Sequence, residues 1–559
     1  MSERLGCWDA VAETLAQSGC EVVFGLPSDE PGLLDAAERH PGLAVKVFGD
    51  QRVAGCAAAG YAMASGRPVV LALNSGPGFA NAMPALLEAA SLGVPLVVVT
   101  TRVPGANIGR GAFQHLEQRG LAAPLTGWHH LAEHAGNLSW ALHRAVRLAV
   151  DGRAGISLVE ITDELTRESV PRPAVRPVRA LRAAGDPDQL DRAARLLSEA
   201  ERPLIVVGGG CRQAAAGEDV LRLAEALGAP VFTTAAGRGT VPESHRLCFG
   251  LLGLYTTPPA DALLEKADVV LVLGSRLEET ARMRWEGWQR ARMIQVDKSA
   301  EAFGESAEPE IAVLADAGLA VRGLLERVRP GETRLYWAAE QALVRPELAA
   351  LAQVGFGQSP VRATIGQVTE VLGPPPVVVL ENGLHDIWAY HYPVLRVDAG
   401  TRVVCPGEQT MMGFGVAASA GAAMTTTGPV VVFTGDSAFL LSVGALAALA
   451  EHSLGVILVV FDNGGFGWPR FLRAATGEPD RLTAVRQRRN PAELAAAFGG
   501  WGTTARNEAE LHDALLMAKQ NAAAGRFTVI RVPVPDDDVP AGVLAMEEFD
   551  EMEAAGGPA

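Results

Sequence analysis

The sequence lacks the features that would place a chain of 559 residues in a membrane or among nucleic-acid-binding proteins. No run of about 18 apolar residues free of glycine, proline or charge occurs, so we expect no membrane span. Basic residues are outnumbered, and the formal net charge is −16. We therefore expect neither nucleic acid nor an anionic membrane as a partner, because both are bound through basic faces.

Cysteine is scarce and unpaired. The sequence has six cysteines: Cys7, Cys20, Cys56, Cys211, Cys248 and Cys405. No two of them form a CxxC pair, which argues against a zinc site and against a disulfide scaffold. The first residues, MSERLGCWDAVAETLAQSG, are amphipathic and include acidic side chains, so they do not predict a signal peptide. Reduced thiols and a cytoplasmic location are therefore expected.

Short apolar runs, in contrast, are abundant and alternate with helical stretches rich in alanine and leucine. They lie at 68–74, 95–101, 203–210, 268–275, 376–382, 429–436 and 455–463. Near-continuous apolar runs of this length are typical of strands buried on both faces, which occur in parallel sheets covered by helices. The sequence therefore predicts an α/β fold of doubly wound domains with mainly parallel sheets.

Two stretches interrupt this alternation. Residues 166–189 are rich in proline and arginine, and residues 328–358 are polar and mixed. Both are interpreted as linkers. They divide the chain into predicted domains at 1–165, 187–327 and 359–540, each of the size of one doubly wound domain.

Residues 435–467, GDSAFLLSVGALAALAEHSLGVILVVFDNGGFG, carry the most chemistry. One predicted strand ends in Gly435-Asp436 and the next ends in Asp462-Asn463-Gly464-Gly465, with a helix between them. Parallel strands direct their carboxyl ends to one crevice, so this carboxylate and this amide oxygen could share a hard cation such as Mg²⁺. Taken singly, each piece could also be ordinary turn chemistry after a strand.

This stretch resembles the thiamine diphosphate–Mg²⁺ motif of thiamine-dependent enzymes, with Ser437 in place of the usual third glycine. Five other segments resemble the acetolactate synthase-like group of that family. They are NSGPGFANA (74–82), GRGAFQ (109–114), AAGRGTVPESHRLCFG (235–250), ENGLHDIWAYHY (381–392) and MMGFGVAASAGA (411–422). The resemblance implies pyrimidine-binding, central and diphosphate-binding domains. It also implies a homodimer or homotetramer, with cofactor sites between subunits.

The resemblance assigns Mg²⁺ to Asp436, Asn463 and the Gly465 carbonyl. It assigns the cofactor to residues on both outer domains: Pro77, Asn81, His385, Met412, Gly435 and Ser437. His385 would contact the diphosphate, and Pro77 and Asn81 the aminopyrimidine. Met412, directly before Gly413-Phe414-Gly415, would lie under the thiazolium ring; core filling is the alternative for a methionine.

Further positions concern the substrate. Phe113 and Gln114 would line the substrate cavity, and His115 is either a surface residue or a group that titrates near neutral pH. The loop around Asp29 resembles one in pyruvate decarboxylases that carries a catalytic aspartate, but Asp29 could also be a solvated loop acid. Gly127 stands where a lysine is common, which weakens the case for an acetolactate synthase substrate.

The family's activating glutamate has no counterpart at the expected place. Counted back from Gly60 without a gap, that position holds Gln51. Glutamine can donate or accept a hydrogen bond but cannot carry a proton between atoms. A slip of one residue would instead bring Asp50 to this position, although the alanine and glycine pattern favours Gln51.

We therefore expect a thiamine diphosphate- and Mg²⁺-dependent enzyme that decarboxylates a 2-keto acid and ligates the product to an acceptor. A simple decarboxylase and a catalytically impaired homologue with a structural role are the alternatives. The stretches 206–212 and 272–279 of the central domain follow strands, as a nucleotide site requires, but neither is GxGxxG. FAD is therefore possible but not expected.

Overall fold

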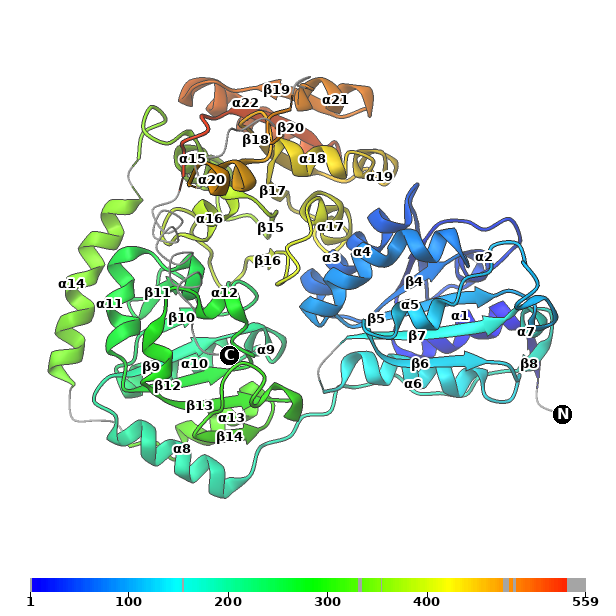
Figure 1. The fold of residues 1–559 in the computed structure, drawn as a ribbon, viewed down its shortest axis with the longest axis horizontal. Coiled ribbons are helices and arrows are strands. Elements are labelled where there is room, and N and C mark those ends of the chain that lie inside the picture. Colours follow the sequence, from blue (N-terminus) through cyan, green and yellow to red (C-terminus); the bar gives the residue numbers. More distant parts are fainter. Residues whose placement is uncertain are drawn as a thin grey trace.

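The computed structural model describes residues 3–539 apart from 153–154, 330–333, 353, 476–481 and 486–488. This part of the chain forms three six-stranded sheets in which all paired strands run parallel. Each sheet belongs to a separate part of the molecule, and helices cover it (Figure 1). The predicted class, three α/β domains with parallel sheets, is confirmed.

The first sheet has the order β3-β2-β4-β5-β7-β6. Its strands are β2 (Val22–Gly25), β3 (Ala44–Val47), β4 (Val69–Leu73), β5 (Leu96–Arg102), β6 (Thr126–Ala132) and β7 (Ile156–Thr162). Its helices are α1 (Cys7–Ser18), α2 (Leu33–Arg39), α3 (Gln51–Ser65), α4 (Pro77–Leu92), α5 (Gln118–Ala122), α6 (Leu138–Val150) and α7 (Asp163–Thr166). Within β4, Leu71 packs into one hydrophobic core and Val70 into another. The strand is therefore buried on both faces, which explains its unbroken apolar sequence.

The second sheet has the order β11-β10-β9-β12-β13-β14. Its strands are β9 (Pro203–Val207), β10 (Val231–Thr233), β11 (Cys248–Leu251), β12 (Val269–Leu273), β13 (Arg292–Asp297) and β14 (Ile311–Leu314). Its helices are α8 (Pro187–Glu199), α9 (Gly209–Gln213), α10 (Gly217–Leu227), α11 (Pro258–Lys266), α12 (Glu279–Arg282), α13 (Ala317–Leu325) and α14 (Leu335–Leu351). Helix α14 lies within the stretch 328–358 that the sequence predicts to be a linker. Its Trp337 is buried, and the indole Nε1 donates to Pro203 O at 3.0 Å.

The third sheet has the order β16-β15-β17-β18-β20-β19. Its strands are β15 (Val377–Leu380), β16 (Arg402–Val404), β17 (Val430–Gly435), β18 (Val456–Asp462), β19 (Trp501–Thr504) and β20 (Thr528–Pro533). Its helices are α15 (Pro360–Leu372), α16 (Leu384–Tyr390), α17 (Phe414–Ala423), α18 (Asp436–Leu441), α19 (Ala445–Glu451), α20 (Gly467–Ala475), α21 (Pro491–Ala497) and α22 (Glu508–Ala523). Strands β17 and β18 are neighbours, with Gly435 opposite Phe461. Both strands therefore end at one edge of the sheet.

Helices α3 and α17 join the first and third domains and lie side by side (Figure 1). A Cβ added at Gly60 would lie 2.1 Å from the Ala418 carbonyl oxygen, and one at Gly421 would lie 1.7 Å from the Ala57 carbonyl oxygen. The two helix backbones are thus in direct contact, which only glycine allows at these positions. Small residues on both helices set the distance between the domains.

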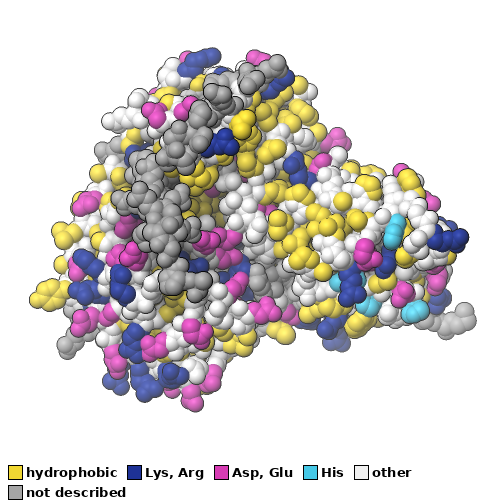
Figure 2. All heavy atoms as spheres, in the orientation of Figure 1, with side chains coloured by type: hydrophobic (Ala, Val, Ile, Leu, Met, Phe, Trp, Pro, Cys, Tyr) yellow, Lys and Arg dark blue, Asp and Glu magenta, His cyan; other side chains and the backbone are white. Residues whose placement is uncertain are grey.

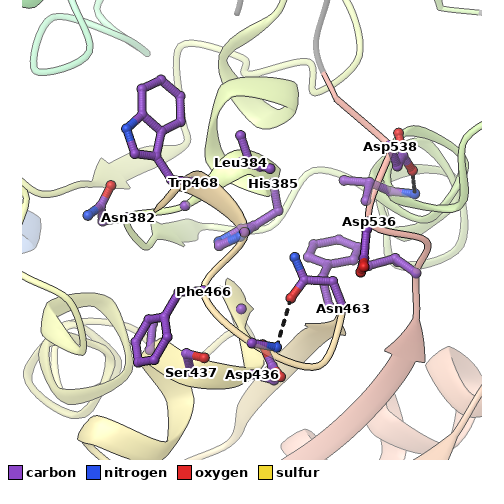
Figure 3. Close-up of a pocket in the computed structure, with 18 of the residues that line it drawn as sticks. Asn382, Leu384, His385, Asp436, Ser437, Asn463, Phe466, Trp468, Asp536 and Asp538 are labelled. Carbon is purple, nitrogen blue, oxygen red and sulfur yellow. Dashed lines mark hydrogen bonds between the residues drawn. The ribbon is translucent and has the colours of Figure 1, made fainter. Parts of the chain in front are cut away.

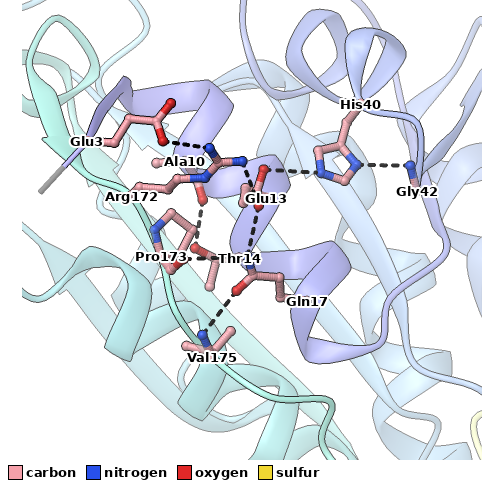
Figure 4. Close-up of polar contacts among 10 residues, drawn as sticks. All are labelled: Glu3, Ala10, Glu13, Thr14, Gln17, His40, Gly42, Arg172, Pro173 and Val175. Atoms are coloured by element: carbon pink, nitrogen blue, oxygen red, sulfur yellow. Dashed lines mark hydrogen bonds and ion pairs between the residues drawn. The ribbon is translucent and has the colours of Figure 1, made fainter.

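The segment after the first domain is tied back to it. Strand β8 (Ser169–Pro171) pairs antiparallel with β1 (Arg4–Gly6), inside the predicted linker 166–189. Arg172 then forms ion pairs with Glu3 at 2.8 Å and Glu13 at 3.5 Å (Figure 4). These pairs are exposed, so they guide the path of the chain more than they stabilise it. In the described part of the chain, no helix has the length and apolarity needed to span a membrane.

Candidate active site

A pocket opens at the carboxyl edge of the third sheet. Its volume is about 160 Å³, and its lining residues all lie between Val361 and Asp538. Asp436, Ser437, His385 and Asn463 converge on it from the ends of β17 and β18 and from α16 (Figure 3). A crevice beyond the carboxyl ends of parallel strands is the expected ligand site in sheets of this kind.

The predicted metal ligands are adjacent because β17 and β18 are adjacent. Asp436 begins α18, directly after β17, and Asn463 follows the last residue of β18. The Asn463 Oδ1 accepts a hydrogen bond from the Gly465 amide at 3.2 Å, which keeps the turn compact (Figure 3). The structure therefore brings the three predicted ligands, Asp436, Asn463 and Gly465, to one pocket.

The preceding aspartate shapes this turn. Asp462 Oδ1 accepts from the Gly464 amide at 3.1 Å, and its Oδ2 pairs with Arg531 on β20. Gly465 is confined as well, because an added Cβ would lie 2.1 Å from the Thr483 carbonyl oxygen. The turn that the sequence suggests after β18 is therefore present. It holds the amide oxygen of Asn463 and the carbonyl oxygen of Gly465 at the pocket.

Two polar atoms in the pocket wall have no hydrogen-bond partner among the residues that the structure describes. They are His385 Nε2 and Ser437 Oγ, both on buried side chains. Burial lowers the pKa of His385 to about 3, so its ring is neutral and able to donate or accept one bond. Buried polar atoms without partners are costly, and an anionic oxygen-rich ligand would satisfy both. The diphosphate of the expected cofactor fits this donor set.

Oxygen ligands at this edge suit Mg²⁺, but they do not make a complete metal site. Among the described residues, no group of three or more His, Cys, Asp or Glu side chains could hold a metal ion. Asp436 contributes a carboxylate, whereas Asn463 and Gly465 offer neutral oxygens. A cation bound here would need oxygens from a phosphorylated ligand, which is how Mg²⁺ is usually held.

The N-terminal candidates lie on the first domain, and none of its described residues lines this pocket. Gln51 is the first residue of α3, and its Oε1 accepts from Asn81 Nδ2 at 2.9 Å. Asp50 is the N-cap of the same helix, and its Oδ1 accepts from the Val53 amide at 3.0 Å. Asn81 Nδ2 also approaches Asp50 Oδ2, at 3.3 Å. Pro77 begins α4, one turn before Asn81.

Comparison with known proteins shows the same division into three domains. Residues 7–121 match the N-terminal TPP binding domain of thiamine pyrophosphate enzymes, 190–324 the central domain, and 381–532 the C-terminal TPP binding domain. The chain belongs to the thiamine pyrophosphate enzyme family.

Curated members of this family align with most of the chain. A probable acetolactate synthase 2, chloroplastic, of Oryza sativa subsp. japonica is 31% identical over 84% of this chain and 72% of that protein. The acetolactate synthase of Mycobacterium bovis is 27% identical over 91% of this chain and 85% of its own length. The acetolactate synthase isozyme 1 large subunit of Escherichia coli is 27% identical over 89% of both chains. The chain is thus an acetolactate synthase-like member of the thiamine pyrophosphate enzymes.

The substrate residues expected from the family lie on loops of the first domain. Asp29 is exposed between β2 and α2. Gln114 has a left-handed backbone with φ of 57°, and its carbonyl oxygen would lie 2.4 Å from a Cβ at Gly76. Phe113 is 83% exposed, whereas His115 Nε2 is buried with no hydrogen-bond partner in the described part of the chain. The structure does not bring these residues to the pocket of the third domain within one chain.

Three residues at or beside the pocket do not appear among the sequence predictions. Trp468 on α20 and Asp536 after β20 line the pocket, and Arg470 lies two residues after Trp468 on α20. Arg470 Nη1 pairs with Asp536 at 2.6 Å and contacts the Asn463 carbonyl oxygen at 3.3 Å. The apolar run FTVIRVPVP before Asp536 signals a strand end. That this strand, β20, lies beside β18 follows from the order of strands in the sheet, which the sequence does not reveal.

The central-domain glycines have a packing reason. The Gly208 amide donates to the Leu273 carbonyl at 2.8 Å, and the Gly210 amide donates to the Gly274 carbonyl at 3.0 Å. A Cβ at Gly208 would lie 2.2 Å from the Gly274 carbonyl oxygen. Direct contact between the two loops therefore accounts for these glycines without a nucleotide, and the expectation about FAD stays a prediction.

Proposed function

We propose that this protein is a thiamine diphosphate- and Mg²⁺-dependent enzyme that decarboxylates a 2-keto acid and joins the remaining acyl unit to an acceptor carbonyl. The observation that carries the proposal is the pocket in which Asp436, Asn463 and Gly465 lie beside His385 Nε2 and Ser437 Oγ, two atoms with no hydrogen-bond partner among the described residues. Bound thiamine diphosphate supplies the electron sink that allows a 2-keto acid to lose CO₂. The names of the relatives favour ligation over simple decarboxylation.

The residues divide the work of binding. Asp436, Asn463 and the Gly465 carbonyl would hold Mg²⁺, while His385 and Ser437 would donate to diphosphate oxygens. Met412 lines the same pocket and would support the thiazolium ring.

We further propose that the enzyme is a homodimer or homotetramer in which two chains complete each site. Gln51, Pro77 and Asn81 lie outside the pocket of their own chain, so they would serve the pocket of a neighbouring copy. Exposed apolar side chains border this region: Val47 on β3, Leu87 on α4 and Leu441 on α18. Figure 2 shows hydrophobic side chains over the positions of α4 and α18 in Figure 1.

A catalytically impaired homologue is the second candidate, and Gln51 is the observation that favours it. A positioned acid–base group contributes on the order of 10²–10⁴ in rate, and Gln51 cannot supply it. We nevertheless propose an enzyme, because Asp436, Asn463 and Gly465, the three residues expected to bind Mg²⁺, all line the pocket. A slow enzyme, or one whose substrate supplies the missing base, fits Gln51.

Incubation with Mg²⁺, thiamine diphosphate and a series of 2-keto acids beginning with pyruvate tests the function. Release of CO₂ together with an acyloin-type product supports ligation, release of an aldehyde indicates simple decarboxylation, and tight cofactor binding without turnover indicates the impaired homologue. Shared sites are tested by mixing Asp436→Asn and Asn81→Ala chains. Activity above that of either variant alone requires that the two residues serve one site from different chains.

A further inference from the structure

The segment that carries Met412 is irregular and held in an unusual conformation. It leads from β16 to α17 and includes Thr410 with φ of 43° and Gly413 with φ of 85°. The Asn382 side chain donates to the Thr410 carbonyl at 2.8 Å and retains this turn. A non-glycine residue with positive φ persists only where its surroundings hold it, and such positions cluster at functional sites.

A buried glutamate of the first domain binds this segment. Glu88 lies on α4, is fully buried, and accepts from the Gly407 amide at 2.5 Å and the Met411 amide at 2.8 Å. The contact is close, because a Cβ at Gly407 would lie 2.7 Å from Ser91 Oγ of the same helix. The Met411 amide, directly before Met412 in the chain, is therefore bound by a residue of a different domain.

A second buried glutamate binds the other side of Met412. Glu381, after β15 in the same domain, accepts from the Gly413 amide at 3.1 Å and the Gly415 amide at 2.9 Å. Both amides that flank Met412 thus donate to carboxylates, one from each of two domains. Met412 itself lines the pocket with Asp436 and His385.

Simple packing between the domains does not explain Glu88. Burial raises the pKa of Glu88, and the hydrogen bonds from Met411 and Gly407 oppose that rise. An apolar side chain would fill the same volume without the desolvation cost of a carboxylate. What the carboxylate adds is two directed, charge-assisted bonds to particular backbone amides. These two bonds fix the position of the segment, which apolar contact over the same area would not do.

We propose that Glu88 is a positioning residue that holds the backbone of residues 407–411 so that Met412 supports the thiazolium ring of the cofactor. This inference rests on the proposed cofactor. It makes the first domain of a chain responsible for part of the pocket in the third domain of the same chain. The diphosphate end, held by Asp436, Asn463 and His385, would not depend on Glu88.

That separation gives the test. Metal-free protein, wild type or Glu88→Gln, is supplied with Mg²⁺ and titrated in a calorimeter with thiamine diphosphate or with inorganic diphosphate. The dissociation constants of the two ligands are then compared. Glutamine keeps one acceptor but places an NH₂ group against the second amide. We expect its dissociation constant for thiamine diphosphate to rise roughly tenfold or more, whereas that for inorganic diphosphate changes less than about twofold.

Glu243→Gln is the matched control. Glu243 is also buried, pairs with Arg238 at 2.6 Å, and accepts from the Val397 amide of the third domain at 2.8 Å. We expect this variant to lower stability without changing the ratio of the two dissociation constants. Met412→Ala should lose the preference for thiamine diphosphate by itself, and adding Glu88→Gln should then have little further effect, because both changes remove one interaction.

The outcomes are distinguishable. The role of Glu88 would be overturned if Glu88→Gln left the ratio of the two dissociation constants unchanged, including by raising both equally. Full additivity with Met412→Ala would overturn it as well. A wild type that binds neither ligand would overturn the proposed function instead. If Glu88→Gln does not fold, Glu88→Asp is measured by the same criteria, since its shorter carboxylate cannot reach both amides.

Discussion

Replacing Gln51 by Glu introduces a carboxylate at the position where the resemblance predicts the activating glutamate of the family. The change is isosteric, and the partner is already present, because Asn81 Nδ2 lies 2.9 Å from Gln51 Oε1. A carboxylate oxygen accepts this bond equally well. The variant therefore adds an ionisable group with little rearrangement of α3 or α4.

The expected effect of Gln51→Glu on the catalytic barrier is larger than its expected effect on folding stability. A carboxylate in the first turn of a helix stabilises it by about 0.3–1 kcal/mol. The like charge of Asp50, the adjacent N-cap, opposes this by a similar amount, roughly 0.2–0.5 kcal/mol. We therefore expect the stability of Gln51→Glu to stay within about 1 kcal/mol of wild type. A positioned acid–base group contributes on the order of 10²–10⁴ in rate, or about 3–5 kcal/mol of barrier.

The assay is the rate of hydrogen–deuterium exchange at C2 of bound thiamine diphosphate, measured by acid quench and NMR. We expect slow exchange in wild type and exchange faster by at least about 10² in Gln51→Glu. Asp50→Asn is the control, since asparagine caps the helix as aspartate does. Fast exchange in wild type that Gln51→Glu does not increase would refute the reasoning, and slowing by Asp50→Asn would assign activation to Asp50.

Three further predictions follow from the site and the packing. Asp436→Asn removes the one carboxylate of the three proposed ligands, so Mg²⁺-dependent binding of thiamine diphosphate should weaken at least about tenfold in titrations with and without EDTA; unchanged Mg²⁺ dependence would contradict the assignment. Gly421→Ala places a Cβ 1.7 Å from the Ala57 carbonyl oxygen and should lower the free energy of unfolding by about 2 kcal/mol or more in urea denaturation. Gly366→Ala, where no atom lies within 4 Å of the added Cβ, should not. Burial, reinforced by nearby arginines, lowers the pKa of His391 to about 3, so the unfolded chain gains a proton below pH 6.5 that the folded chain does not take up. The free energy of unfolding should therefore fall as the pH drops from 6.5 towards 3, by up to about 1.4 kcal/mol per pH unit from this residue. His391→Phe should make the denaturation midpoint less dependent on pH. An equal pH dependence in both proteins would contradict this.

The sequence alone determined the architecture and the core of the pocket. The seven apolar runs correspond to strands β4, β5, β9, β12, β15, β17 and β18. They were recognisable because strands buried on both faces leave an unbroken apolar pattern. Asp436 and Asn463 were predicted to lie together for a related reason, since consecutive parallel strands joined by one helix tend to be neighbours.

Contacts between distant segments were not readable from the sequence. The polar, mixed composition of 328–358 predicts a linker where α14 lies. The position of Trp337 is decided only by its contact with the second sheet, where its Nε1 donates to Pro203 O. Gln51 and Asp50 are adjacent in the chain, and only the fold shows Asp50 capping α3 while Gln51 meets Asn81.

The contact between Glu88 and the Met412 segment is the clearest case of what only the tertiary structure decided. These residues lie more than half the chain apart, and a single acidic residue in an apolar helix has no partner visible in the sequence. Local patterns encode which faces of an element are buried, because burial follows the period of the element. The partner of a buried carboxylate depends on how whole domains pack, and that is set by close contacts such as those of Gly60 and Gly421 between α3 and α17.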